Sequence, residues 1–321
     1  MYRGNCLLTK HVTLSNFHFP LLAELDIGTF DECEDTLPEL DCFEHALRLC
    51  TLGTSEVPTS KVPYHQLRCL ELWDSHSSLV EILHRCPSVK SLGLVGWEDY
   101  DPESSTHYMS RNITSLTITK DYDSYLELVL LTFNLPLLSM IVLDSHDEAP
   151  EYWPTETFIS FISRESSCMI TTFTLRSISL SDLDFLAALQ VMPSLLHLEI
   201  EGYQRVHPPD QYSPITSNLI SRLIQHEYTS TSLVPKLHTL HLVSQYNNGT
   251  FDNSAFVNMV KSRWFRPGSD RFAAMSIMGR SCIRSVVLKF DWREVDAEVY
   301  KPVRNLDNEG LRVVVAGTNG F

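Results

Sequence analysis

The sequence predicts an α/β repeat protein in which short parallel strands alternate with helices along the whole chain. Three observations support this prediction. An aliphatic phrase recurs at intervals, a proline precedes many of its copies at one fixed distance, and amphipathic segments fill the space between copies. Because no strand-plus-helix unit of this size can bury its apolar face alone, we expect the units to stack on one another.

The recurring phrase is Leu-x-x-Leu-x-Leu, with other aliphatic residues at each position. Alternation at period 2 in its second half marks a short strand with one buried face. Most copies start 20 to 32 residues after the previous one, and the last two steps are longer and require insertions. The clear copies begin at Leu22, Leu67, Val89, Ile113, Leu138, Ile170, Leu195, Leu237 and Ile283. A weaker copy is Leu47, Cys50 and Leu52, and the run Leu311–Val315 closes the array.

Proline and helix signals separate the copies. Five prolines lie five residues before the central aliphatic residue of their repeat, and each ends a helix because proline lacks an N–H group. They are Pro20, Pro87, Pro136, Pro193 and Pro235. Helical patterns cover Ser77–Cys86, Ser124–Phe133, Thr155–Ile162, Thr216–His226, Asn253–Trp264 and a segment that begins at Ser181. Ser181 with Asp184 three residues on resembles a capping box.

A strand and a helix in each unit of roughly 20–29 residues are typical of leucine-rich repeats. The sequence therefore predicts a single leucine-rich-repeat domain over residues 1–321, with about ten irregular repeats. In this solenoid the strands form a parallel sheet on the concave side and the helices lie on the convex side.

Composition excludes several classes of protein. The chain has 25 Lys and Arg against 40 Asp and Glu, a net charge of −15, which argues against nucleic acid as the main partner. None of the eight cysteines forms a C-x-x-C pair, so neither a zinc site nor a compact disulfide framework is expected. No secretory signal or membrane span is visible, and we expect a cytoplasmic or nuclear protein without membrane contact.

The sequence also resembles the leucine-rich-repeat region of the F-box-like protein family of mushroom-forming fungi. The resemblance covers nearly the whole chain and rests on four stretches, which are Tyr64–Leu72, His84–Leu92, Phe256–Trp264 and Asn308–Val315. It implies that the repeats recruit the substrate of a ubiquitin ligase. Family members dock onto the ligase adaptor through an N-terminal F-box. No recognisable F-box precedes the first repeat here, although Leu37-Pro38-Glu39-Leu40 is faintly similar to its opening, so an adaptor is expected only if an F-box equivalent exists.

The residues that alternate with the buried aliphatic positions should line the open face of the strands, where we expect a protein partner. Trp73 is the sharpest candidate because exposed tryptophans are frequent hot spots, although it could instead fold over a neighbour. The candidates on this face are Glu24, Asp26, Glu71, Trp73, Asp144, Arg176, His197, Glu199, Glu201, His241 and Lys289. Aromatic residues that follow the strands could form a binding rim or cap the core edge. They are Trp73, Trp97, Tyr122, Tyr203, Tyr246 and Trp292.

Other readings of particular segments stay open. Arg263-Trp264-Phe265-Arg266 could recognise an acidic partner or pack its loop onto the repeats. His197, Glu199 and Glu201 alternate on one strand and could belong to a metal enzyme or hydrolase, but no catalytic motif accompanies them. We therefore expect a protein-binding scaffold rather than an enzyme, with no cofactor and no metal. The alternative is a structural, repeat-only protein that associates with itself.

Overall fold

The computed structural model describes residues 19–27, 43–55, 61–73, 79–96, 108–120, 125–145, 153–164, 169–202, 213–225, 232–244, 251–291 and 293–317. The chain forms two compact units, Met1–Leu138 and Ser139–Phe321. Both repeat the same alternation of strand and connecting segment. The single-domain organisation expected from the repeats remains a prediction.

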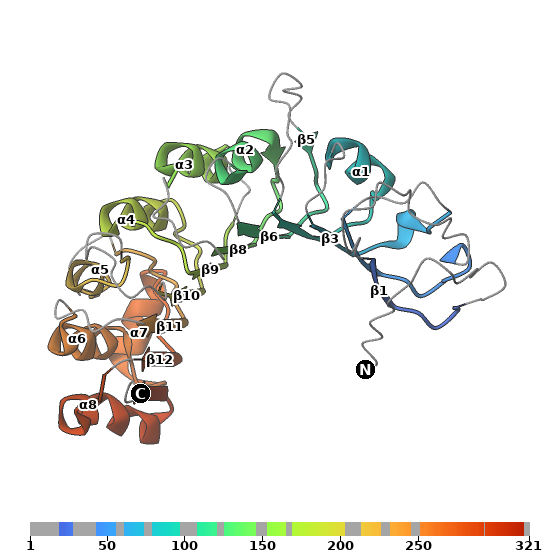
Figure 1. Cartoon of the computed structure of the whole chain (residues 1–321). Helices are drawn as coiled ribbons and strands as arrows, with labels where there is room; N and C mark the ends of the chain where they lie inside the picture. Colours follow the sequence, from blue (N-terminus) through green and yellow to red (C-terminus); the bar gives the residue numbers. More distant parts are fainter. Residues whose placement is uncertain are drawn as a thin grey trace. The chain divides into compact units, whose positions relative to one another are not determined.

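In the first unit, five strands pair in parallel in the order β1-β2-β3-β4-β6, so that successive repeats lie side by side (Figure 1). Their bounds are Glu24–Ile27 for β1, Thr51–Thr54 for β2, Cys69–Trp73 for β3, Ser91–Val95 for β4 and Ser115–Lys120 for β6. The 3-10 helix η3 covers Tyr64–Gln66, α1 covers Leu79–Arg85 and α2 covers Tyr125–Thr132. A separate short pair joins β5, Tyr108–Met109, to β7, Phe133–Asn134.

In the second unit, six strands pair in parallel in the order β8-β9-β10-β11-β12-β13. The strands are β8 Met140–Ser145, β9 Thr172–Arg176, β10 His197–Glu201, β11 Thr239–Ser244, β12 Ser285–Phe290 and β13 Arg312–Gly317. The helices are α3 Thr155–Ser163, α4 Asp182–Gln190, α5 Ser217–Arg222, α6 Asn253–Arg263, α7 Asp270–Ile277, α8 Ala297–Arg304 and the 3-10 helix η6 Asn305–Glu309.

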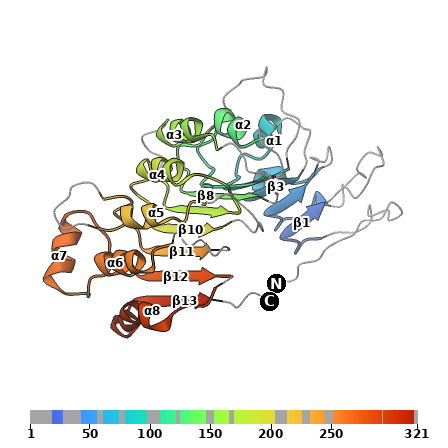
Figure 2. The ribbon, with the colours of Figure 1, turned by 60° about the vertical axis from the view of Figure 1, so that its left-hand side comes forward.

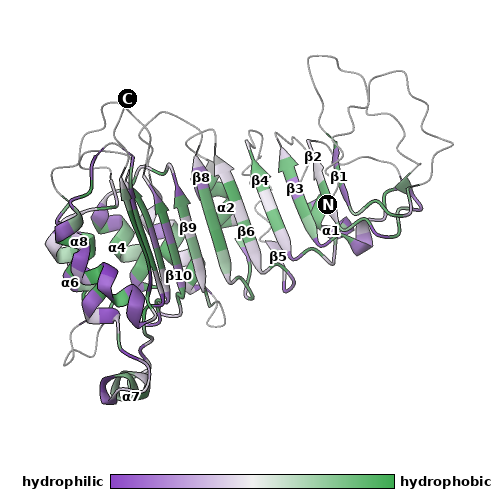
Figure 3. Cartoon of the chain, turned by 90° about the horizontal axis from the view of Figure 1, so that it is seen from below, coloured by the Kyte–Doolittle hydropathy of each residue, from purple (hydrophilic) through white to green (hydrophobic). Residues whose placement is uncertain are grey.

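The helices of the second unit gather on one side of its strands. Figures 1 and 2 show α3, α4, α5, α6 and α8 side by side against one face of β8–β13, whereas α7 lies apart from that row. Between these helices and the strands lies an aliphatic and aromatic core. In β10, Leu198 and Ile200 are buried, while His197 is exposed. Figure 3 shows polar and apolar residues mixed along the strands. The predicted α/β class with parallel strands and helices is thus confirmed.

Local signals in the sequence set the helix starts. The Ser181 Oγ accepts a hydrogen bond from the Asp184 amide at 3.1 Å, and Thr216 caps α5 in the same way. Adjacent helices are also tied together, because the Thr216 hydroxyl donates to the Asp182 carboxylate at 3.1 Å. A side-chain cap satisfies amides that the first turn of a helix leaves without partners. The expected capping box and helix ranges are close to those observed.

One predicted register is wrong. Leu47 was expected to be a buried anchor of the second repeat, but it is 76% exposed, and Leu49 is buried instead. In the sheet Leu52 pairs with Leu70 and Thr54 pairs with Leu72, so the phrase is Leu49-x-x-Leu52-x-Thr54. The polar Thr54 is fully buried at the third position. The sequence pattern missed the correct register because a threonine, Thr54, occupies a position that is aliphatic in the other repeats.

The segment Arg263–Arg266 packs into the second unit. Arg263 is fully buried, and its guanidinium donates to the carbonyl oxygens of Leu223 and Leu233 at 2.6 Å and of Val234 at 3.0 Å. Trp264 and Phe265 are buried as well, whereas Arg266 is exposed. These contacts favour the packing interpretation of this segment. Among the helices that the structure describes, none has the length and apolar character needed to cross a membrane.

Candidate functional site

Polar side chains line the face of β9–β13 opposite the helices. The strand register aligns them in rows that run across the strands, because equivalent residues of parallel neighbours pair directly. One row, at the strand starts, is Thr172, His197, Thr239, Ser285 and Arg312. The next row is Thr174, Glu199, His241, Val287 and Val314. A third row contains Arg176, Glu201, Val243 and Lys289, with Asp144 of β8 opposite Arg176.

Charged groups on β9, β10 and β11 form one network. Arg176 donates to Glu199 Oε1 from Nη2 at 3.1 Å and from Nε at 3.3 Å. Arg176 Nε also lies 4.0 Å from Glu201 Oε2, and His241 Nδ1 lies 4.0 Å from Glu199 Oε1. These side chains are partly exposed, at 41% for Arg176 and 30% for Glu199. The network is therefore preformed yet reachable by a partner.

The surroundings of His241 favour its neutral form. Burial lowers the pKa of His241, and the positive charges of Lys289 and Arg176 lower it further, whereas Glu199 and Glu201 act in the opposite direction. The Nε2 atom of His241 is buried and has no hydrogen-bond partner among the residues that the structure describes. A neutral imidazole beside a carboxylate that Arg176 already holds is a weak ion-pair partner.

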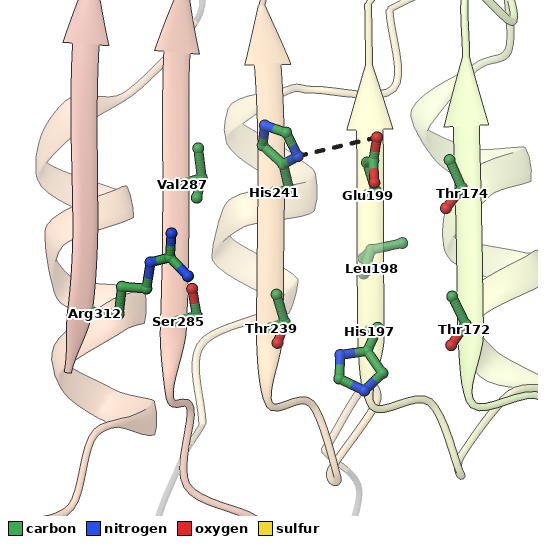
Figure 4. A pocket seen from close by; sticks show the side chains of 10 residues that line it. All are labelled: Thr172, Thr174, His197, Leu198, Glu199, Thr239, His241, Ser285, Val287 and Arg312. Carbon is green, nitrogen blue, oxygen red and sulfur yellow. Dashed lines mark ion pairs between the residues drawn. The ribbon is translucent and has the colours of Figure 1, made fainter. Parts of the chain in front are cut away.

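The first two rows border a shallow hollow of about 250 Å³. Figure 4 shows the hollow from the open side, with Glu199 and His241 at one level and His197, Thr239, Ser285 and Arg312 nearer the strand starts. The predicted candidates His197, Glu199 and His241 lie here together. Thr172, Thr239, Ser285 and Arg312 were missed, although each directly precedes the central apolar residue of its repeat, and Thr174, which follows Phe173, was missed as well.

The first unit carries a different polar patch. Trp73 Nε1 donates to Glu71 Oε1 at 3.0 Å, and the indole reaches over β2. A Cβ atom built on Gly53 would lie 2.6 Å from Trp73 Cη2 and 2.6 Å from Asp26 Oδ1. Trp73 thus folds over a neighbour on the open face while remaining partly exposed. Glu24 lies at the start of the same face on β1.

The predicted aromatic rim has five further members besides Trp73. Trp97, Tyr122, Tyr203, Tyr246 and Trp292 lie outside the described residues. Among the residues that are described, no group of three or more His, Cys, Asp and Glu side chains is placed to hold a metal ion. His197, Glu199 and Glu201 share a strand, but Arg176 already engages both carboxylates.

No family model matches the chain, and a search of curated proteins finds no significant match.

Proposed function

We propose that the protein is a leucine-rich-repeat scaffold that binds a protein partner on the open face of its strands. The observation that carries this proposal is the Arg176–Glu199–Glu201–His241 network, which lies partly exposed on the strand face of the second unit. Charged networks of this kind give an interface specificity and direct the encounter with a partner. Binding through such a network involves no chemical reaction, and a solvated polar face is common in repeat proteins.

The geometry of a repeat supports the curved form that the sequence predicts. Neighbouring strands lie about 4.8 Å apart, whereas packed helices need about 8–10 Å between their axes. A stack with one strand and one helix in each repeat must therefore bend toward its strands. We propose that the open face is the concave side of such a solenoid, where one partner can touch several strands at once.

The resemblance to F-box-like proteins suggests which kind of partner to seek. We propose that the chain recruits the substrate of a ubiquitin ligase, with the strand face as the recruiting surface. Repeats that present successive strands to one partner suit this role, because each strand contributes a few contacts to a large interface. The ligase adaptor would be a second partner, bound elsewhere on the assembly.

Site-specific photocrosslinking in native extract would test this proposal. The test pair is Val314→benzoylphenylalanine on the strand face and Leu183→benzoylphenylalanine on α4, since both side chains are solvent-exposed. We expect the strand-face variant alone to crosslink a discrete protein, and Glu199→Lys to abolish that product. Equal crosslinking from Leu183, or no effect of Glu199→Lys, would contradict the proposal. Copurified ligase adaptor and cullin would support the recruiting role, and their absence beside a specific crosslink would indicate a stand-alone binding module.

A further inference from the structure

Two arginines and two histidines lie where β10, β11, β12 and β13 begin. His197 and Arg312 are the first residues of β10 and β13, and His238 and Arg284 immediately precede β11 and β12. Their backbones are direct neighbours, because the Arg284 amide donates to the His238 carbonyl at 2.8 Å and the Arg312 amide donates to the Arg284 carbonyl at 3.0 Å. This cluster stands out in a chain with a net charge of −15.

The surroundings of His238 disfavour its protonated form. Burial lowers the pKa of His238, and the charges of Arg284 and then His197 lower it further. Within the part of the chain that the structure describes, the side chains of Arg284, Arg312 and His197 make no hydrogen bond or ion pair. Arg284 and Arg312 therefore have guanidinium donors available for a bound anion.

Hydroxyl groups complete the donor set. Thr239 and Ser285 occupy the same row as Arg312 on adjacent strands, and their hydroxyls also make no hydrogen bond among the described residues. In Figure 4 the Arg312 side chain extends from β13 toward Ser285, with Thr239 on the next strand. All three border the hollow. Adjacent parallel strands are about 4.8 Å apart, so one tetrahedral anion at Ser285 lies within reach of both neighbours.

From this placement we infer that the hollow binds the phosphate group of a phosphorylated serine or threonine on the partner protein. The inference rests on the proposed function and names the chemistry of its partner. A phosphate monoester has a charge of about −1.5 to −2 and three terminal oxygens. It can use guanidinium and hydroxyl donors together, whereas a carboxylate offers two oxygens and one charge.

Glu199 borders the same hollow and would repel an anion placed beside it. Its backbone lies one row farther along the strand, about 6.6 Å from the first row at 3.3 Å per residue, and Arg176 partly neutralises its carboxylate. The hollow therefore has a positive charge from Arg312 in its first row and a negative charge from Glu199 in its second row. The phosphate occupies the strand starts, and the peptide that carries it continues over the Arg176–Glu199 network, which a free phosphate ion would not contact.

The test uses the full chain and two fluorescent peptide pools that have either phosphoserine or serine at the centre and random flanks. We expect the phosphoserine pool to bind about tenfold more tightly or better, which corresponds to about 1.4 kcal/mol. Arg312→Gln should weaken its binding about fivefold or more, since it removes a charge-assisted contact. The matched control Arg222→Gln, an exposed arginine on α5, should change it less than about twofold.

Histidine-selective NMR locates the bound group. Titration with acetyl-phosphoserine amide should raise the pKa of His238 in the wild type and not in Arg312→Gln, at unchanged melting temperature. Equal affinity for both pools, equal losses in Arg312→Gln and Arg222→Gln, or an unmoved His238 would overturn the inference. Inorganic phosphate that binds as tightly as the phosphoserine pool would overturn its peptide part. If the Val314 variant still crosslinks a protein but the two peptide pools bind equally, only this inference is overturned. If the phosphoserine pool binds more tightly but the Val314 variant crosslinks no protein, the proposed function is overturned.

Discussion

The indole of Trp73 occupies the space that a side chain on Gly53 would need. A Cβ atom at Gly53 would lie 2.6 Å from Cη2 and 2.7 Å from Cζ2 of Trp73. The tryptophan is consequently seated on β2 as well as anchored to Glu71. Glycine at this position therefore has a packing role in the open face of the first unit.

Gly53→Ala should displace Trp73. We expect a loss of about 1 kcal/mol in unfolding free energy, within the range of about 1–3 kcal/mol for overpacking, and a Trp73 signal that acrylamide quenches more strongly. The contribution of Trp73 is obtained by subtracting the fluorescence of the corresponding Trp73→Phe variant. Gly93→Ala is the graded control, because its Cβ would meet the flexible Glu71 Cγ at 3.1 Å. Identical quenching in Gly53→Ala and wild type would show that the indole does not rest on Gly53.

Leu198→Ala tests the repeat register. Leu198 is 1% exposed in β10, and the exposed Leu183 on α4 provides the same substitution outside the core. Leu198→Ala should cost about 2–5 kcal/mol because it removes a buried side chain and leaves a cavity. Leu183→Ala should stay within about 0.5 kcal/mol. Chemical denaturation measures both, and similar midpoints for the two variants would refute the register.

The sequence predicts strands where the buried positions are aliphatic and helices where capping residues precede apolar stripes. Ser181 is such a case, since its cap needs only Asp184, three residues away. The second repeat was misread because its third core position is Thr54, which no hydropathy pattern distinguishes from a surface threonine. Period-2 reasoning is reliable only where residue type and burial agree.

The candidate site was predicted in part for a related reason. The alternation predicts His197, Glu199 and His241 on the open face, and in the structure all three border one hollow. The alternation does not distinguish Thr239 or Ser285 from other polar residues, because their importance comes from Arg312 and Arg284 on neighbouring strands. Those neighbours are brought together only by the strand register.

Arg263→Met should destabilise the second unit strongly. Arg263 satisfies three carbonyl groups, including that of Leu223, 40 residues earlier in the chain. Burial lowers the pKa of Arg263 to about 10, so it remains charged at neutral pH. Its loss leaves buried acceptors unpaired, and we expect a cost of about 3 kcal/mol or more. The exposed Arg266→Met is the control, and calorimetry should show it within about 0.5 kcal/mol of wild type.

The two histidines with lowered pKa values predict how stability changes with pH. His238 and His241 lose protons more readily in the folded chain, chiefly because they are partly buried. The unfolded chain therefore binds more protons than the folded chain below the ordinary histidine pKa of about 6.5. By linkage, their contribution is fully present above that pH and is lost as the pH falls below it.

The double variant His238→Gln, His241→Gln should consequently lose less stability than wild type between about pH 7.5 and 5. Carboxylates that titrate in the same range affect both proteins, so the difference between the two melting curves isolates the histidines. Because burial is the largest cause of both shifts, the difference should persist at about 0.5 M salt, which screens exposed charges. Parallel pH profiles at low salt would contradict the prediction. A difference that vanished in salt would instead assign the shifts to Arg284, Lys289 and Arg176.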